Sequence, residues 1–183
     1  MPSGVRNSFL QKAGESPLPR IIFTKMKHAT LCYLINGNEI LLGLKKRGFG
    51  QGKWNGFGGK VKEGETPEQA TIREIKEEMD VGLLPSNLQK VAEIDFFFSK
   101  VPEWNQKVHV FFSKSWDGSP KESEEMLPKW FAIKDMPIYK MWNDDPHWLP
   151  HTISGKKIKA EFTFGEDNES ITGKKVSFVN NFN

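Results

Sequence analysis

The chain of 183 residues has one cysteine, Cys32, and no apolar run of the length that crosses a bilayer. One cysteine excludes an intramolecular disulfide framework and favours a reducing compartment. A membrane-spanning helix needs about 20 consecutive apolar residues, so we expect no membrane partner. Aromatic residues make up 12% of the chain, which favours a packed core over disorder. We therefore expect a cytoplasmic protein, with a mitochondrial or nuclear fraction left open.

Acidic residues are absent from residues 44–62, which contain six basic ones. The next segment, residues 63–80, contains seven acidic and two basic residues. The net charge of +3 does not describe most of the chain, because residues 1–28 carry +4 and the rest of the chain carries −1. A basic segment beside an acidic one suits a phosphate chain gripped through a metal ion better than a nucleic-acid surface. Two solvated faces of opposite sign are the alternative.

Steady periodicity is lacking at the start of the chain. We predict a flexible N-terminal extension over residues 1–26 and one domain over residues 27–183, a usual domain size. Glu15 and two prolines would interrupt any amphipathic helix in the extension. Its scarcity of acidic residues would also suit a targeting segment, and Met26 would serve as an alternative start.

Alternating and apolar runs predict a mixture of strands and two helices. Asn36-Gly37 favours a type I′ hairpin turn, and residues 136–142 suggest a short helical turn. Thr66 is the expected N-cap of the first helix, with Pro67 at its first position and Gln69 completing a capping box. The helix should end near residues 80–82, and a second is predicted over residues 145–154. The predicted strands cover residues 29–35, 39–44, 88–98, 107–115, 128–133, 158–164 and 174–178.

Three carboxylates, Glu74, Glu77 and Glu78, share one face of the first helix because they stand at i, i+3 and i+4. Their mutual repulsion would be offset by a divalent cation, and oxygen ligands suit Mg²⁺, with Mn²⁺ as a substitute. Arg73 is placed to pair with Glu65 or with Glu77. An ordinary solvated helix face is the alternative. The four histidines show no ligand spacing and are interpreted as structural or surface residues.

Residues 59–81, GKVKEGETPEQATIREIKEEMDV, resemble the sequence box of the Nudix hydrolase family. One position departs from the pattern, since Asp80 replaces the glycine that ends the helix in a left-handed conformation. Gly82 is expected to take over part of that role. The positions that match are Gly59, Glu65, Arg73, Glu74, Ile75, Glu77, Glu78 and Val81.

The resemblance implies an α/β fold, the Nudix α/β/α sandwich with a mixed β-sheet. It also implies Mg²⁺-assisted hydrolysis of a nucleoside diphosphate linked to another group. The implied catalytic residues are Arg73, Glu74, Glu77 and Glu78. The implied metal ligands are the same three glutamates, the backbone of Gly58 and Gly59, and Glu125 from an acidic cluster at residues 122–125.

The likeness extends to residues 45–62, 108–111, 122–131 and 141–145. These segments resemble the eukaryotic branch of the family that hydrolyses oxidised purine nucleoside triphosphates, such as 8-oxo-dGTP and 2-hydroxy-dATP, to the monophosphate and pyrophosphate. Gln106 stands where those relatives carry methionine, and Asn143 where they carry proline. The base pocket that this likeness implies contains Thr30, Lys45, Phe49, Asn55, Phe96, Phe98, Met126, Trp142, Asp144 and Asp145.

Each polar or flat residue of that pocket has a chemical rationale. Trp142 offers a face for stacking on a purine, and Asn55 has a donor and an acceptor for a base edge. Asp144 and Asp145 are adjacent carboxyls among aromatic residues, so one proton should be shared between them. Lys45 would lie near the phosphates or the base, although a solvated surface lysine is nearly as well supported.

Two other functions stay open at this stage. One is a different Nudix activity, on a methylated purine triphosphate, an ADP-sugar, a dinucleoside polyphosphate or an RNA cap. The other is a non-catalytic nucleotide- or RNA-binding protein, against which the intact Glu74, Glu77 and Glu78 argue. For the enzyme we expect a monomer that takes a small nucleotide and forms no stable nucleic-acid complex.

Overall fold

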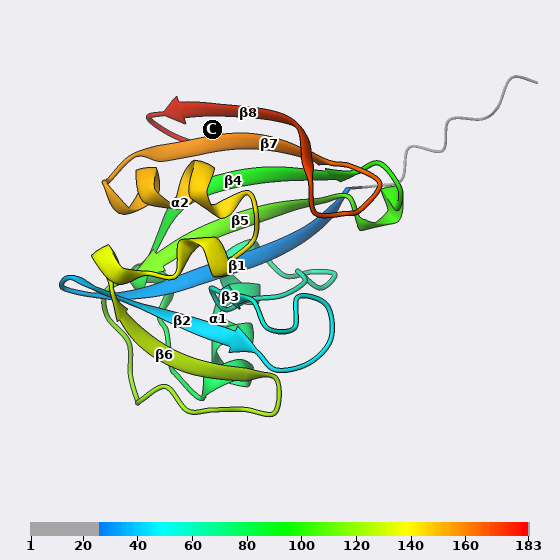
Figure 1. Cartoon of the computed structure of the whole chain (residues 1–183). Coiled ribbons are helices and arrows are strands. Elements are labelled where there is room, and N and C mark those ends of the chain that lie inside the picture. The colour runs from blue at the N-terminus through cyan, green and yellow to red at the C-terminus, as the bar shows by residue number, and fades with distance from the viewer. Residues whose placement is uncertain (1–25, 183) are drawn as a thin grey trace, which may run out of the picture.

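The structure, a computed structural model, describes residues 26–182. The predicted extension therefore lies outside the described residues except for Met26. Two helices, α1 (Pro67–Met79) and α2 (Asp145–Ile153), flank a mixed sheet (Figure 1). Four short 3₁₀ turns are η1 (Pro85–Asn87), η2 (Pro102–Trp104), η3 (Ile133–Asp135) and η4 (Ile138–Lys140). The strands are β1 (Lys27–Asn36), β2 (Glu39–Lys45), β3 (Trp54–Asn55), β4 (Leu88–Phe98), β5 (Gln106–Ser113), β6 (Met126–Ala132), β7 (Lys157–Phe164) and β8 (Ile171–Val179).

The strand order is β3-β2-β1-β5-β4-β7-β8, and β6 pairs with β2. Strands β1 and β5 are parallel, as are β4 and β7, while the other pairs are antiparallel. The register of β1 with β2 covers two pairs beside their turn, Ile35–Ile40 and Asn36–Glu39. Beyond these pairs, residues 57–61 run beside β1 instead, and Thr30 N–H donates to the Gly59 carbonyl at 2.8 Å. This pairing fixes Gly58 and Gly59 near the start of β1.

Apolar side chains fill both faces of the sheet, because successive residues of a strand point to opposite sides. In β1, Tyr33 belongs to the cluster under α2, whereas Cys32 and Leu34 belong to the cluster that contains Ile75 and Met79 of α1. Figure 1 shows the two helices on opposite sides of the strands. The predicted α/β/α sandwich is therefore confirmed.

Every predicted strand is present in the structure, with its ends shifted by up to three residues. The turn prediction was wrong, because the two turn residues are Gly37 and Asn38, one position later than expected. A type I′ turn needs positive φ at both positions. Gly37 has φ +57°, but φ of Asn38 is not positive.

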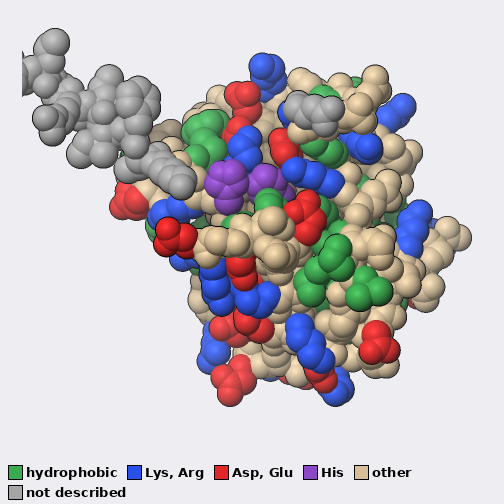
Figure 2. Space-filling view, turned by 180° about the vertical axis from the view of Figure 1, so that it is seen from behind, with side chains coloured by type: hydrophobic (Ala, Val, Ile, Leu, Met, Phe, Trp, Pro, Cys, Tyr) green, Lys and Arg blue, Asp and Glu red, His purple; other side chains and the backbone are tan. Residues whose placement is uncertain are grey.

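The sheet face away from α2 is charged where α1 does not cover it. Figure 2 shows acidic and basic side chains gathered around histidines on this side of the molecule. Asp95 pairs with Lys107 at 2.8 Å, and His28 Nδ1 lies 2.9 Å from His109 Nε2. Burial lowers the pKa of His109 to about 4, so this histidine is neutral at pH 7. Among residues 26–182, the helices are too short or too polar to span a membrane.

Candidate active site

Helix α1 begins and ends on defined caps. Thr66 Oγ1 accepts a hydrogen bond from the Gln69 N–H at 3.2 Å, and Gln69 Oε1 accepts one from the Thr66 N–H at 2.8 Å. The predicted capping box is therefore confirmed. At the other end Asp80 itself adopts the left-handed conformation, φ 57° and ψ 32°, and pairs with Lys76 and Lys121. The expectation for Gly82 was wrong, because its backbone pairs with Asp117 instead.

Arg73 connects the loop before α1 to the helix carboxylates. Its guanidinium donates to both oxygens of Glu65, at 2.7 and 2.9 Å, and to the Lys60 carbonyl at 3.0 Å. It also reaches Glu74 at 2.6 Å and Glu77 at 3.3 Å. Arg73 therefore pairs with both of the partners that the sequence left open, Glu65 and Glu77. The hydrogen bonds from Arg73 lower the pKa of Glu65 to about 2.

Glu74 and Glu78 converge on the Gly58–Gly59 turn. Glu78 Oε2 accepts a hydrogen bond from the Gly58 N–H at 2.9 Å. A Cβ atom on Gly59 would lie 2.6 Å from the carboxyl carbon of Glu74, so any larger residue there would displace this carboxylate. Burial raises the pKa of Glu78 to about 7, and the negative charges of Glu74 and Glu125 act in the same direction. The turn therefore carries carboxylates that favour a nearby cation.

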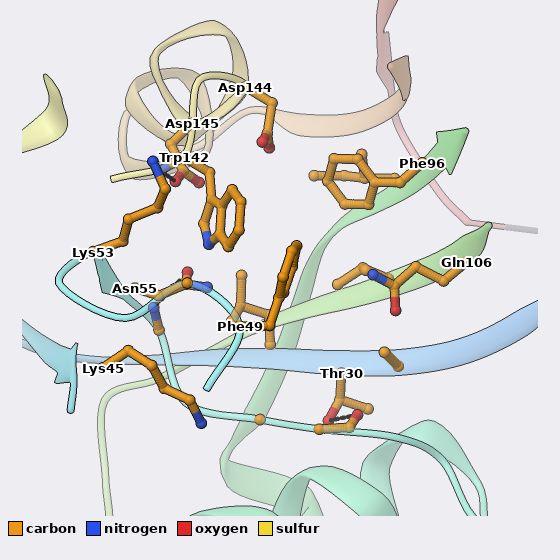
Figure 3. Close-up of a pocket in the computed structure, with 18 of the residues that line it drawn as sticks. Thr30, Lys45, Phe49, Lys53, Asn55, Phe96, Gln106, Trp142, Asp144 and Asp145 are labelled. Atoms are coloured by element: carbon orange, nitrogen blue, oxygen red, sulfur yellow. Dashed lines mark hydrogen bonds between the residues drawn. The ribbon is translucent and has the colours of Figure 1, made fainter. Parts of the chain in front are cut away.

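The turn forms part of the wall of a cavity of about 280 Å³. Figure 3 shows side chains from several strands and loops pointing into this space. All ten residues predicted for the base pocket line it, and so do Gly58, Gly59 and Glu78. Lys45 is thus a cavity residue, held by Glu125 at 2.9 Å. The structure brings the predicted base pocket and part of the predicted metal site together.

Asp144 and Asp145 lie buried at one end of the cavity. Asp144 Oδ2 accepts a hydrogen bond from Trp148 Nε1 at 2.9 Å, and Asp145 Oδ2 accepts one from the Trp142 N–H at 2.8 Å. Burial raises the pKa of Asp144 to about 6. Burial also raises the pKa of Asp145, and the charge of Asp144 adds to that effect. The two carboxyls therefore hold a proton well above the pH at which a solvated aspartate loses it.

The side-chain amide of Asn55 has its oxygen hydrogen-bonded within the protein and its NH₂ group available to a ligand. Its Oδ1 accepts hydrogen bonds from the Gly56 N–H at 2.8 Å and from the Tyr33 hydroxyl at 3.3 Å. The acceptor expected for a ligand is thus used by the protein. The amide NH₂ makes no hydrogen bond to the described residues, so Asn55 offers a ligand donors.

Two aromatic rings of the cavity wall, Phe49 and Trp142, stack on each other. The Phe49 ring stacks on Trp142, with centroids 4.9 Å apart, and contacts Trp104 edge-on at 5.2 Å. Lys53 Nζ lies 5.1 Å from the centroid of the Trp142 ring. Gly50, which follows Phe49, has φ +81°, and a Cβ there would lie 2.7 Å from Trp142 Cζ2. The loop that carries Phe49 therefore depends on glycine to approach Trp142.

Four of the predicted catalytic and metal residues, Arg73, Glu74, Glu77 and Glu125, do not line the cavity. The Glu77 side chain is 56% exposed and the Glu125 side chain 50%, and each forms an ion pair. Within residues 26–182, no three His, Cys, Asp or Glu side chains are gathered so as to hold a metal ion. Mg²⁺ commonly uses one or two carboxylates together with substrate phosphates and water. Glu74, Glu78 and the backbone at Gly58 and Gly59 fit that pattern.

Sequence reasoning missed several cavity residues, among them Lys53, Ile94, Val108, Trp148 and Phe164. The spacing of Trp148, four residues after Asp144, was a usable signal, since such residues are neighbours on a helix. Lys53 lay in the basic segment already noted. Phe164 lines the cavity because it pairs with Phe98 across β7 and β4, and no local pattern encodes this register.

The geometry agrees with comparisons to known proteins. A family model described as the NUDIX domain matches residues 25–152. The chain belongs to the Nudix family. It is 43% identical over 153 residues to the mouse oxidized purine nucleoside triphosphate hydrolase, which covers 84% of this chain and 96% of the mouse protein. The zebrafish protein of the same name is 46% identical with the same coverage.

Solved structures of this Nudix fold show the same architecture. The crystal structure of a MutT protein from Bacillus halodurans superposes with a TM-score of 0.71 at 21% identity. The match covers 82% of this chain and 97% of that protein. At this identity the likeness concerns the fold alone.

Proposed function

We propose that this Nudix protein hydrolyses oxidised purine (deoxy)nucleoside triphosphates, such as 8-oxo-dGTP and 2-hydroxy-dATP, to the monophosphate and pyrophosphate. The observation that carries the proposal is one cavity that joins the Asp144–Asp145 pair and Trp142 to the Gly58–Gly59 turn and Glu78. The names of the mouse and zebrafish relatives support the same substrate class. Such a reaction would remove damaged precursors from the nucleotide pool.

The base is read at the buried end of the cavity. Trp142 stacks on the purine, an interaction valued at about 1–3 kcal/mol per base in single-strand binding. A protonated carboxyl in the Asp144–Asp145 pair donates a hydrogen bond and its ionised partner accepts one, while Asn55 donates through its NH₂ group. Oxidation changes the donors and acceptors on a purine edge. Moving the shared proton between the two carboxyls lets one pocket accept both oxidised guanine and oxidised adenine.

The triphosphate lies toward the glycine turn, where a divalent cation is required. We assign this role to Mg²⁺, with Mn²⁺ as a substitute; when bound, it neutralises phosphate charge and lowers the pKa of an attacking water. Glu74, Glu78 and the backbone at Gly58 and Gly59 would hold the cation, with Glu77 and Glu125 as further carboxylates at this end. Arg73 orients Glu74 and Glu77, and Lys45 reduces the negative charge of the phosphates.

The partner is a small nucleotide. The enzyme works as a monomer, without a stable nucleic-acid complex, in the cytoplasm with a mitochondrial or nuclear fraction. We propose residues 27–183 as the hydrolase domain.

A substrate panel with pyrophosphate detection, run with and without Mg²⁺, tests the proposal. We expect Mg²⁺-dependent pyrophosphate release from 8-oxo-dGTP and 2-hydroxy-dATP well above that from dGTP and dATP. Equal turnover of dGTP and 8-oxo-dGTP, or turnover of neither, refutes it. Faster hydrolysis of a methylated purine triphosphate, ADP-sugar, dinucleoside polyphosphate or capped RNA assigns another Nudix activity. Metal-independent binding without product assigns a binding protein.

A further inference from the structure

A second cavity, of about 630 Å³, lies on the α2 side of the sheet at the end opposite the candidate active site. It is found where β1 and β5 end and where β4 and β7 begin, beside the β1–β2 turn in Figure 1. Its floor includes the buried side chains of Ile35, Val91 and Phe112, which continue the apolar layer under α2. The sheet therefore carries two separate cavities on one face.

The rim of the second cavity is positively charged. Lys114, Lys134, Lys156 and Lys157 line it, and its wall contains no Asp, Glu, His or Cys. None of these lysines pairs with a carboxylate among residues 26–182, although Lys157 Nζ donates to the Asn180 carbonyl at 3.3 Å. Lysines beside the first cavity behave differently: Lys45 pairs with Glu125 and Lys46 with Glu122. The rim lysines thus concentrate positive charge without internal compensation.

Polar groups at the same rim are also available to a ligand. The side chains of Asn38 and Gln89 make no hydrogen bond to the described residues, and both lie on the cavity wall. Together with the lysines they supply donors above an apolar floor. This combination favours a ligand with a charged end and a flat or apolar body.

We propose that the second cavity binds an amphipathic phosphate, specifically a nucleoside di- or triphosphate, without hydrolysing it. Lysine is a common phosphate ligand that acts as a point charge, and the volume lies within the range of small-molecule sites, about 300–1,000 Å³. A protein partner would need about 800 Å² of surface on each side, and a concave site of this size suits a small molecule better. Because the cavity wall supplies no carboxylate to hold a metal ion, we expect binding there without hydrolysis. This inference is independent of the function proposed for the first cavity.

Titration of the full chain with ADP, followed by backbone amide NMR in EDTA, tests the proposal. ADP is unoxidised, and EDTA prevents metal-dependent turnover at the first cavity. We expect saturable shifts at Gly37 and Gly155, which line the second cavity, that are distinct from any at Gly58 and Gly59. The double variant Lys114→Ser/Lys134→Ser should bind about tenfold more weakly or worse, because each charged hydrogen bond contributes substantially to affinity.

A charge-matched control separates a site from general attraction. The double variant Lys100→Ser/Lys140→Ser removes two exposed lysines that line neither cavity, so it should bind ADP as the wild type does. The proposal is overturned if Gly37 and Gly155 show no saturable shift. It is also overturned if both double variants weaken binding equally, or if inorganic pyrophosphate binds as tightly as ADP, because the apolar floor would then contribute nothing. The amide spectrum of each variant shows whether it is folded.

Discussion

Asp144 and Asp145 are chemically identical residues whose surroundings give them unusual protonation. Both are buried and each accepts one hydrogen bond, from the Trp148 indole and the Trp142 backbone respectively. Two adjacent carboxylates in such a place cannot both ionise cheaply. Around Arg73, by contrast, three carboxylates share one guanidinium group, which holds them in fixed positions.

The Asp144 carboxyl should make stability depend on pH. Its raised pKa means that the folded state keeps a proton which the unfolded state has already released above about pH 4. Stability from this proton is present below the unfolded pKa and is lost as the pH rises through about 6. Asp144→Asn resembles the protonated form, so its stability relative to wild type should rise between pH 4 and 7, by about 2–3 kcal/mol, and then level off.

Urea unfolding measured across that pH range gives the comparison. Asp135→Asn, at an exposed position at the end of η3, is the matched control and should follow the wild type throughout. A stability difference between Asp144→Asn and wild type that stays constant with pH would contradict the assigned protonation.

Replacing Arg73 should impair turnover more than folding. Arg73→Gln leaves Glu65, Glu74 and Glu77 without their shared donor, and groups that orient metal ligands commonly contribute about 10–100-fold in activity. We expect kcat for 8-oxo-dGTP to fall by about that factor, with a rise in the Mg²⁺ concentration needed for half-maximal rate. Lys76→Gln, on the same helix but paired with Asp80, should leave both quantities near wild type. Equal losses in the two variants would show that Arg73 has no specific role.

At the scale of elements, the sheet and the loops were predictable to different degrees. Periodicity identified each long strand and helix, because burying one face imposes a regular pattern. The capping box of α1 was predictable from Thr66 and Gln69, since both partners lie within one turn. The left-handed Asp80 was not, because lysines from α1 and from the loop at Lys121 compensate for the absent glycine. The hairpin turn was misassigned by one residue, because strand register is set by cross-strand pairing.

The glycine loop before β3 provides a matched pair of variants. Gly50 and Gly52 both have positive φ, so alanine should destabilise the fold by about 1–2 kcal/mol at either site. A Cβ on Gly50 would press on Trp142, whereas one on Gly52 meets nothing within 4 Å. We expect Gly50→Ala alone to raise KM for 8-oxo-dGTP by about tenfold, through displacement of the stacking ring. Steady-state kinetics on both variants decide the matter, and equal KM values would count against a contact through Trp142.

At the scale of the whole molecule, stability and the proposed chemistry reside in different parts. Apolar clusters on both faces of the sheet hold the fold, while the carboxylates lie at the Gly58–Gly59 turn on its edge. Because the buried clusters contain none of the glutamates assigned to the cation, we expect the core to assemble without a metal ion. This separates the molecule from small domains that fold only with metal bound.

Removal of divalent metal should therefore abolish turnover and leave the fold intact. With EDTA we expect no pyrophosphate release from 8-oxo-dGTP, and added Mg²⁺ or Mn²⁺ should restore it. The thermal midpoint should fall by no more than about 4 °C, since a weakly bound ion contributes about 1 kcal/mol at millimolar concentration. Circular dichroism and the pyrophosphate assay, run on the same samples, test both parts. Unfolding in EDTA would show that the metal is structural.

The sequence alone determined the α/β class, the cap at the start of α1, the acidic face of that helix and the family, because these depend on residues close together in the chain. It also predicted ten residues for a base pocket, through resemblance over several segments. Only the tertiary structure decided that these residues share one cavity and that Glu77 and Glu125 lie outside the cavity wall. It also decided that the amide oxygen of Asn55 accepts hydrogen bonds from the protein itself. It also revealed the lysine-rimmed second cavity. These facts depend on strand register and packing between distant segments, which no local pattern specifies.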